Sequence, residues 1–305
     1  MSDLFDVDGA NLDHGFENIR AGESPVEQQL RAMLQEMWMH YEPYADPDFR
    51  QGFARDVDGR FWEMYLGCTL LAAGRTLLPA IDRQREGGQP DLCVIEDDRR
   101  IWIEAITPDV GDPGPDQIVR PVPINEGGGF VAAPTRQAQI RTSGAFWNKA
   151  QRIARYIEQG VIASEDARII AISGSRFGVY VAEQPLPLIM RTLFPIGDAF
   201  VTIDPITGDV LQEGFFDAPH ILREGNAIPR TAFVVERFAC ISGVIWSRVS
   251  IGNLSRESRP ITYVHNPLAQ VPLPMNWGVW DREFVTIRDG ERWESNDILA
   301  TTVAT

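Results

Sequence analysis

Apolar residues recur at spacings of three and four along three segments of the chain, the period of an amphipathic helix. The segments span residues 26–41, 59–73 and 145–159. Pro and Gly residues follow them and predict where each helix ends. The pattern therefore predicts helices in both the N-terminal region and the middle of the chain.

Between and after these helices, short apolar runs predict β-strands. Three strands are expected over 76–81, 91–95 and 101–107, before the third helix, and a fully buried strand over 168–173 after it. The stretch from Pro108 to Pro134 is rich in Pro and Gly and shows no period, which predicts a long functional loop. The order is helix, three strands, helix, strand.

The remainder of the chain is predicted to be mostly strands. Apolar runs over 178–182, 199–203, 231–238 and 243–251 are separated by Pro, Gly and Asn. These strands either extend the same sheet or form a second small domain. We expect an α/β (α+β) fold with an acidic tail and helix over 1–58, a core over 59–176 and a β-rich region over 177–305.

Composition and charge restrict the class of protein. The 305 residues are 44% hydrophobic with a formal net charge of −15, which excludes disorder as the main state. No apolar run is long enough to span a bilayer, and the acidic N-terminus lacks the pattern of a signal peptide. Cys68, Cys93 and Cys240 lie far apart and predict free thiols. We expect a cytoplasmic protein with no membrane contact.

One stretch of this acidic chain is basic. No acidic residue lies between Glu126 and Glu158, whereas five basic residues do. One of them, Lys149, is the only lysine among 28 basic residues, a ratio that a GC-rich, bacterial genome would explain. The other four are candidate contacts to nucleic-acid phosphates, or they offset the acidic N-terminal region. These four are Arg136, Arg141, Arg152 and Arg155.

Two carboxylates are predicted to face each other across a β-hairpin. If the turn is centred between residues 97 and 98, opposed residues have numbers that sum to 195, which places Asp91 opposite Glu104. Like charges so placed are destabilising, and both lie in apolar runs where a buried, unpaired carboxylate is costly. A divalent cation between them would remove this cost. Alternatively, Asp91 is half solvated at a turn and Glu104 pairs with an arginine.

These residues resemble a known superfamily. Pro90-Asp91, followed by Glu104 at the end of an apolar strand, is similar to the PD-(D/E)XK, or restriction-endonuclease-like, nucleases. The resemblance covers about residues 59–173 and implies a core of helix, three-stranded antiparallel meander, helix and strand. It also implies Mg²⁺ (or Mn²⁺) bound by Asp91 and Glu104, with a helical Glu that Glu63 matches. Alternatively, Glu63 forms a surface ion pair with Arg60.

The chain departs from the superfamily at one position. The resemblance places a signature lysine two residues after the acid, where this chain has Ile106. Lys149 lies in the following helix, and we expect its side chain to reach back to Asp91 and Glu104 and to lower the pKa of both. The alternative is a solvated lysine on an exposed helix face.

These features and the resemblance predict a Mg²⁺-dependent nuclease. The resemblance, and no residue pattern of this chain, implies that DNA is preferred to RNA and that the protein acts as a homodimer. One alternative is a nuclease-fold protein that no longer cleaves and serves as a binding or assembly module. Another is an enzyme of different chemistry that binds a small ligand. Two further motifs are weaker: His265 is expected to be structural, and Gly127-Gly128-Gly129 lacks the context of a P-loop.

Overall fold

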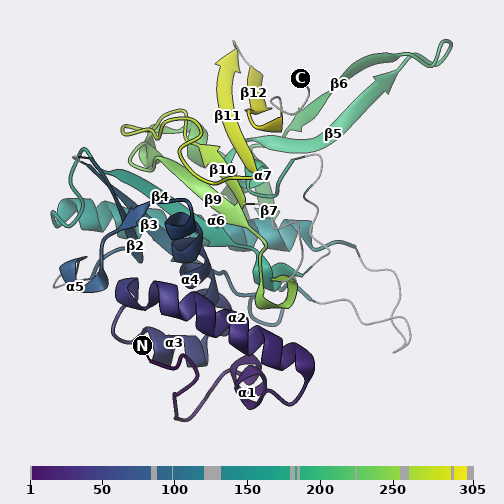
Figure 1. Ribbon diagram of the computed structural model, residues 1–305. Helices are drawn as coiled ribbons and strands as arrows, with labels where there is room; N and C mark the ends of the chain where they lie inside the picture. The colour runs from purple at the N-terminus through teal and green to yellow at the C-terminus, as the bar shows by residue number, and fades with distance from the viewer. Residues whose placement is uncertain are drawn as a thin grey trace.

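The structure is a computed structural model that describes residues 2–83, 88–97, 99–119, 132–178, 183, 186–223, 225–254, 261–289 and 292–300. Within these residues, an eight-stranded mixed sheet forms the centre of the molecule, as Figure 1 shows. In sheet order its strands are β1 (Thr76–Leu77), β2 (Leu92–Glu96), β3 (Arg99–Ile106), β4 (Ala167–Ser173), β9 (Gly243–Ser247), β10 (Ile261–His265), β11 (Arg282–Asp289) and β12 (Arg292–Asp297). The fold is therefore of the α+β class.

The β2–β3 hairpin has the predicted register. Leu92 lies opposite Ile103, Cys93 opposite Trp102 and Glu96 opposite Arg99, so every pair sums to 195. β1 pairs antiparallel with β2, and β4 pairs parallel with β3. The predicted order of helix, three strands, helix and strand is present between residues 57 and 173, except that the short helix α5 (Ala80–Arg83) lies between the first two strands.

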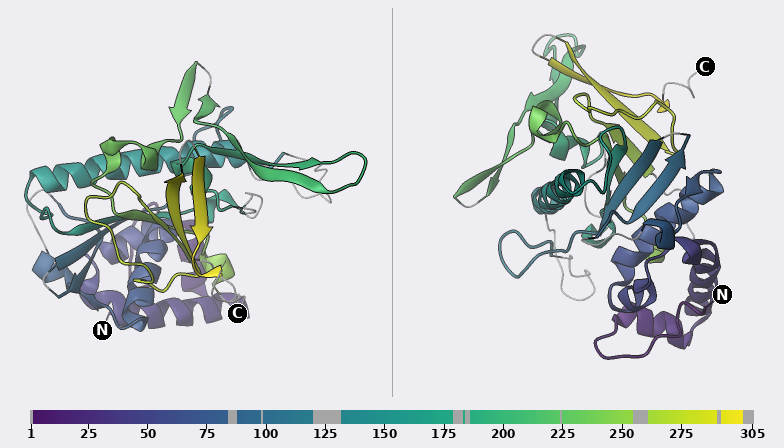
Figure 2. Two further views of the ribbon diagram at one scale, coloured as in Figure 1. Left: turned by 90° about the horizontal axis from the view of Figure 1, so that it is seen from above. Right: turned by 90° about the vertical axis from the view of Figure 1, so that its left-hand side faces the viewer.

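Strand β4 separates two hydrophobic cores. All seven of its residues are buried because it pairs with β3 on one side and β9 on the other, and helices cover both faces. Ile169 and Ala171 face the N-terminal helices, whereas Ile170 and Ile172 face helix α6 (Thr135–Glu158). Figure 2 shows the two helical layers on opposite sides of the sheet. Of the region 177–305, strands β9–β12 continue the same sheet, as the first of the two expectations has it, whereas the strands between residues 196 and 229 form two separate two-stranded sheets.

The N-terminal region is more helical than the sequence predicts. Leu4, Phe5 and Val7 are buried, so the expected acidic tail is in part a core segment. Two of the helices have only eight and seven residues, too short for a clear period in the sequence. The helices are α1 (His14–Ala21), α2 (Pro25–Tyr41), a 3₁₀ turn (Glu42–Tyr44), α3 (Phe49–Arg55) and α4 (Val57–Ala72).

Helix α6 begins ten residues before the predicted start at residue 145. Its first turns bury small or polar side chains, among them Ala138, Gln139 and Thr142, and therefore show no apolar period. Residues 120–131, which include Gly127-Gly128-Gly129, lie outside the described residues.

Two other predicted strands differ from the structure, and a third is not tested. Strand β1 stops at Leu77 and is followed by the short helix α5 (Ala80–Arg83). Residues 231–238 form two 3₁₀ turns, Ala232–Val234 and Glu236–Phe238, in place of a strand. Most of 178–182 lies outside the described residues. The remaining elements are two 3₁₀ turns (Ser175–Phe177 and Ile251–Asn253), α7 (Met190–Leu193), and the strands β5 (Ile196–Ile203), β6 (Val210–Asp217), β7 (His220–Arg223) and β8 (Asn226–Pro229).

The cysteines, the helices and His265 were also the subject of sequence-based expectations. Cys68, Cys93 and Cys240 are free thiols, as expected. In the part of the chain that the structure describes, no helix has the length and apolarity to cross a membrane. His265 is buried and its Nε2 lies 2.6 Å from Oε1 of Glu283, as expected of a structural histidine.

Candidate active site

Glu104 lies in the middle of the sheet with its carboxylate directed toward helix α6. Alternation along β3 places it on the same face as Trp102, and its side chain is 0% exposed. Lys149 Nζ lies 2.7 Å from Oε1 of Glu104, and Arg152 Nη1 lies 3.1 Å from the same oxygen. Two cations from successive turns of α6 therefore share one carboxylate oxygen.

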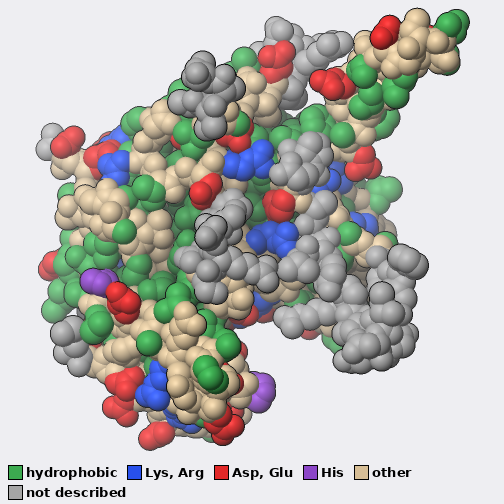
Figure 3. Space-filling view, turned by 45° about the vertical axis from the view of Figure 1, so that its right-hand side comes forward, with side chains coloured by type: hydrophobic (Ala, Val, Ile, Leu, Met, Phe, Trp, Pro, Cys, Tyr) green, Lys and Arg blue, Asp and Glu red, His purple; other side chains and the backbone are tan. Residues whose placement is uncertain are grey.

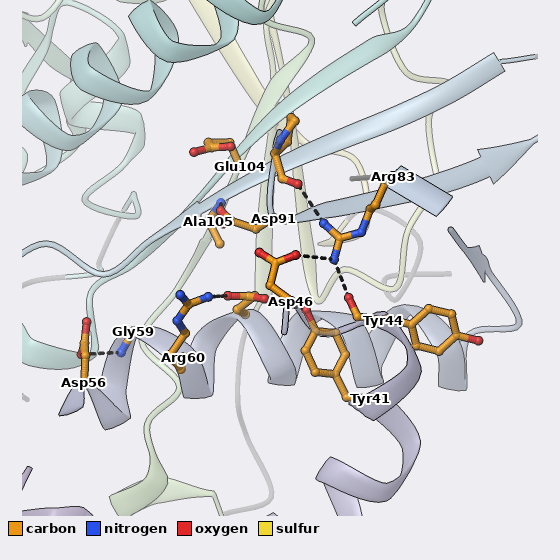
Figure 4. A network of polar contacts seen from close by, with 12 residues as sticks. Tyr41, Tyr44, Asp46, Asp56, Gly59, Arg60, Arg83, Asp91, Glu104 and Ala105 are labelled. Atoms are coloured by element: carbon orange, nitrogen blue, oxygen red, sulfur yellow. Dashed lines mark hydrogen bonds and ion pairs between the residues drawn. The ribbon is translucent and has the colours of Figure 1, made fainter. Parts of the chain in front are cut away.

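Asp91 lies beside this group, at the residue before β2. Extending the hairpin register by one residue places it opposite Glu104. Its Oδ2 accepts a hydrogen bond of 2.6 Å from the Ala105 backbone N–H and lies 3.9 Å from Lys149 Nζ. Figure 4 shows Asp91 between Glu104 and helix α4. The predicted contact of Lys149 with both carboxylates is confirmed.

Glu63 approaches from α4, on the opposite face of the sheet. It is buried, and both of its oxygens have partners: Tyr41 Oη donates to Oε1 at 2.7 Å and Arg60 Nη1 to Oε2 at 2.8 Å. The ion pair with Arg60 exists, but in a buried position and not at the surface. Tyr41 comes from α2, so the N-terminal helices form one wall of the site.

A buried arginine anchors the backbone next to Asp91. Arg83 is 0% exposed in its side chain and donates from Nη1 to the Pro90 carbonyl at 3.0 Å. Its Nη2 donates to the Tyr44 carbonyl and lies 3.6 Å from Asp46 Oδ1 (Figure 4). Sequence reasoning did not identify Arg83 or Tyr41, since no local pattern indicates contacts with residues tens of positions away.

Burial dominates the electrostatics of the carboxylates. It raises the pKa of Glu104 to about 7, and the charge of Asp91 adds to this effect, whereas Lys149 and Arg152 act against it. Burial likewise raises the pKa of Glu63 to about 7, again with a contribution from Asp91. Lys149 acts to lower the pKa of Glu104, as expected, but burial outweighs the ammonium and the pKa is raised overall.

The donor set fits a hard divalent cation. Oε2 of Glu104 is buried and has no hydrogen-bond partner among the described residues, and an unpaired buried carboxylate oxygen is costly. Mg²⁺ takes such oxygens, usually from one or two carboxylates, and keeps several water ligands. No three His, Cys, Asp or Glu side chains within the described ranges converge as a metal-binding group. Ligation by Asp91 and Glu104, with help from Glu63, stays a prediction.

Arg152 and Arg155 lie near one another on α6 but differ in surroundings. The guanidinium of Arg152 contacts Glu104, donates from Nε to Tyr156 Oη at 2.6 Å and has a 43% exposed side chain. Tyr156 in turn donates to the Gln89 carbonyl at 3.1 Å. Arg155 is exposed to solvent. Arg152 is thus held at the site with part of its surface open, whereas Arg155 faces outward.

The other two candidate arginines contact loops near the start of α6. Arg136 lies 3.1 Å from Asp116 and donates to the Leu222 carbonyl at 2.8 Å. The guanidinium of Arg141 packs against Gly111, where any Cβ would collide with it and where φ is +94°. Of the four arginines, Arg152 is the one that contacts a carboxylate of the site, Glu104. Phosphate binding by Arg136, Arg141, Arg152 and Arg155 stays a prediction.

No family model, no curated protein and no solved structure matches this chain. The resemblance to PD-(D/E)XK nucleases therefore rests on Asp91, Glu104, Lys149 and the order of the elements around them.

Proposed function

We propose that the protein is a metal-dependent nuclease that hydrolyses phosphodiester bonds, with DNA as the preferred substrate. The observation that carries the proposal is the contact of Lys149 with both Asp91 and Glu104, at 3.9 and 2.7 Å. A lysine beside two acidic groups is the combination that phosphodiester hydrolysis needs: cation ligands, and a positioned donor that faces developing charge.

Each residue of the site would have a distinct role in hydrolysis. Asp91 and Glu104 would hold Mg²⁺ or Mn²⁺, which when bound neutralises charge on the phosphate and activates water. Lys149 would orient the attacking water or stabilise the pentavalent phosphorane. Glu63, held by Tyr41 and Arg60, would assist from the α4 side. The partly open guanidinium of Arg152 would contact a backbone phosphate without reading sequence.

The proposal extends to partners and location. Nucleic acid would be the macromolecular substrate, and a homodimer would place one site on each strand of a duplex. A cytoplasmic, bacterial protein agrees with free thiols and with the arginine-rich composition. The low pI of about 4.7 confines nucleic-acid contact to a local surface.

A catalytically inactive nuclease-fold module for binding or assembly is the second candidate. It is favoured by Ile106 at the signature position and by Oε1 of Glu104, which already contacts two cations of the chain itself. In such a protein Lys149 and Arg152 would replace the metal and stabilise the core.

Incubation with plasmid, linear and single-stranded DNA and with RNA, in Mg²⁺, Mn²⁺ or EDTA, tests the proposal. We expect metal-dependent cleavage that is lost in Asp91→Ala and Glu104→Gln and retained in Glu36→Gln, a control at an exposed position on α2. Circular dichroism verifies that each variant is folded. Absence of cleavage with every substrate and metal, together with no Mn²⁺ binding, would favour the inactive module.

A further inference from the structure

A two-stranded hairpin projects from the body of the protein. Strands β5 and β6 pair antiparallel, and among the described strands neither pairs with any other. Figures 1 and 2 show that this β5–β6 arm, residues 196–217, extends away from the central sheet. An isolated two-stranded hairpin is marginally stable in water, so an arm of this kind gains stability from a surface that covers it.

Both faces of the arm carry apolar side chains. The pairing places Val201 and Phe215 on one face. Phe200 and Phe216 lie on the other, with ring centroids 4.9 Å apart. A hairpin with one face in solvent would show polar residues on that face. Apolar side chains are therefore exposed on each face of the arm.

The exposed apolar area of the arm is about that of one side of a protein interface. Seven of its large apolar side chains are exposed, from 38% for Phe215 to 92% for Ile206. At roughly 100 Å² each they present about 700 Å². A standard interface buries about 800 Å² per partner. Scattered exposed hydrophobic residues need no explanation, but these seven are gathered on the two faces of one hairpin, and an exposed apolar cluster of this size indicates a binding surface.

The charge of the arm excludes several occupants. No Lys or Arg lies between Arg191 and Arg223, whereas five acidic residues do. Figure 3 shows apolar and acidic side chains along the arm at the upper right. Such a surface repels nucleic acid and anionic membranes. The occupant is therefore a protein surface.

A groove lies at the base of the arm. The cavity of about 920 Å³ is lined by residues of β5 and β6, by Leu186 and Pro195, and by Glu294–Asn296 of β12. A two-fold axis would allow the arm of each copy to enter the groove of the other, because an isologous contact uses the same patches of both copies.

We propose that the β5–β6 arm is the homodimer interface, and that the arm of each copy packs against the arm and basal groove of a second copy of this chain. The proposal requires no nuclease activity, and a failure of either proposal leaves the other standing. Because both arms are acidic, salt should strengthen the dimer by screening their repulsion.

Sedimentation velocity of the full chain, from nanomolar to 100 µM and at 50 mM to 1 M NaCl, tests the proposal. We expect a concentration-dependent dimer whose dissociation constant falls as salt rises. Replacing Ile206 and Leu211, both well exposed, by Ser should raise that constant at least tenfold with an unchanged melting temperature. Val26→Ser removes an exposed apolar side chain on α2 and should change nothing.

A monomer at every concentration and salt would overturn the proposal and leave a different protein as the occupant. A dimer that the Ile206→Ser, Leu211→Ser variant forms as tightly as the parent would place the interface elsewhere. A dimer that weakens with salt would also contradict it, because that dependence indicates contacts between opposite charges.

Discussion

Lys149 Nζ and Glu104 Oε1 lie 2.7 Å apart, although 45 residues separate them in the chain. The contact forms because α6 crosses the face of the sheet on which the Glu104 side chain lies. Lys149 is the only lysine in the protein, and its side chain is 12% exposed. An ammonium group from α6 thus lies on the face of β3 that Trp102, Glu104 and Ile106 share.

Lys149→Met should abolish most cleavage while it preserves the fold and metal binding. A positioned proton carrier commonly contributes about 10²–10⁴-fold to the rate, so we expect a loss of that size. Lys149→Arg should not restore full activity, because a guanidinium does not deprotonate water near neutral pH. The rate of plasmid cleavage with saturating Mg²⁺ measures both effects.

Arg155→Met is the matched control, since Arg155 is exposed on the same helix. It should retain the parent rate of strand cleavage at low salt. If Lys149→Met cleaves as fast as the parent protein, catalysis depends on carboxylates and metal alone.

Stability in the absence of metal should fall as pH rises from about 4.5 to about 7. The pKa of Glu104 and of Glu63 is raised from 4.5 to about 7 in the folded protein, so the folded state binds protons that the unfolded state releases. Their contribution is fully present below pH 4.5 and is lost as pH rises through the folded pKa. Since one pKa unit corresponds to about 1.36 kcal/mol, the loss of each group's contribution should lower the free energy of unfolding by roughly 3 kcal/mol above neutral pH.

Urea unfolding at several pH values in EDTA measures this loss. Glu104→Gln should make the free energy of unfolding depend less steeply on pH between pH 5 and 7. Glu36→Gln should leave this dependence unchanged. Added Mg²⁺ should recover stability at pH 8 in the parent protein but not in Glu104→Gln. A parent protein that is equally stable at pH 5 and pH 8 would contradict the raised pKa values.

Arg152→Gln should strengthen metal binding and weaken nucleic-acid binding. The guanidinium lies 3.1 Å from Glu104 and competes with a divalent cation for the charge of that carboxylate. Its removal should therefore lower the dissociation constant for Mn²⁺ several-fold in calorimetry without nucleic acid. The same change should reduce the salt slope of DNA binding by about one, as expected for one lost phosphate contact.

Arg155→Gln separates these two effects. It should reduce the salt slope but leave Mn²⁺ affinity unchanged, because the outward-facing Arg155 has no recorded contact with Glu104. If neither substitution alters the salt slope, both arginines are structural.

Tyr41→Phe should destabilise the protein by about 1–3 kcal/mol, the usual cost of a buried acceptor without its donor. Tyr41 Oη donates to Glu63, and this hydrogen bond acts to lower the pKa of Glu63. The loss should therefore be larger at pH 8, where Glu63 is ionised, than at pH 5. Urea unfolding at both pH values is the measurement.

Tyr44→Phe is the control for this prediction, because Tyr44 contacts Arg83 through its backbone carbonyl and not through its hydroxyl. The Tyr44→Phe variant should have the same free energy of unfolding as the parent protein at both pH values. Equal losses for Tyr41→Phe and Tyr44→Phe would indicate a packing effect and not a hydrogen bond to Glu63.

Local periodicity was enough to predict several features. The alternation of apolar residues on both sides of one short turn specifies the β2–β3 register, and the register aligns Asp91 with Glu104. The continuous apolar run of β4 indicates a strand buried on both faces. Lys149 was expected near the carboxylates because it lies beside the apolar face of α6. The register and the buried strand depend on residues close together in the sequence, whereas the expectation for Lys149, 45 residues from Glu104, also needed the resemblance.

Packing between distant segments determined the rest. Tyr41, Arg60 and Arg83 complete the site from the N-terminal helices and α5, and no local pattern predicts which side chains meet there. The first turns of α6 bury polar residues against neighbouring elements, so their helical period is invisible to hydrophobicity. The pKa of Glu104 rises although two cations contact it, since burial by the surrounding layers outweighs them. Burial is a property of the assembled layers, and it decides which charges are costly.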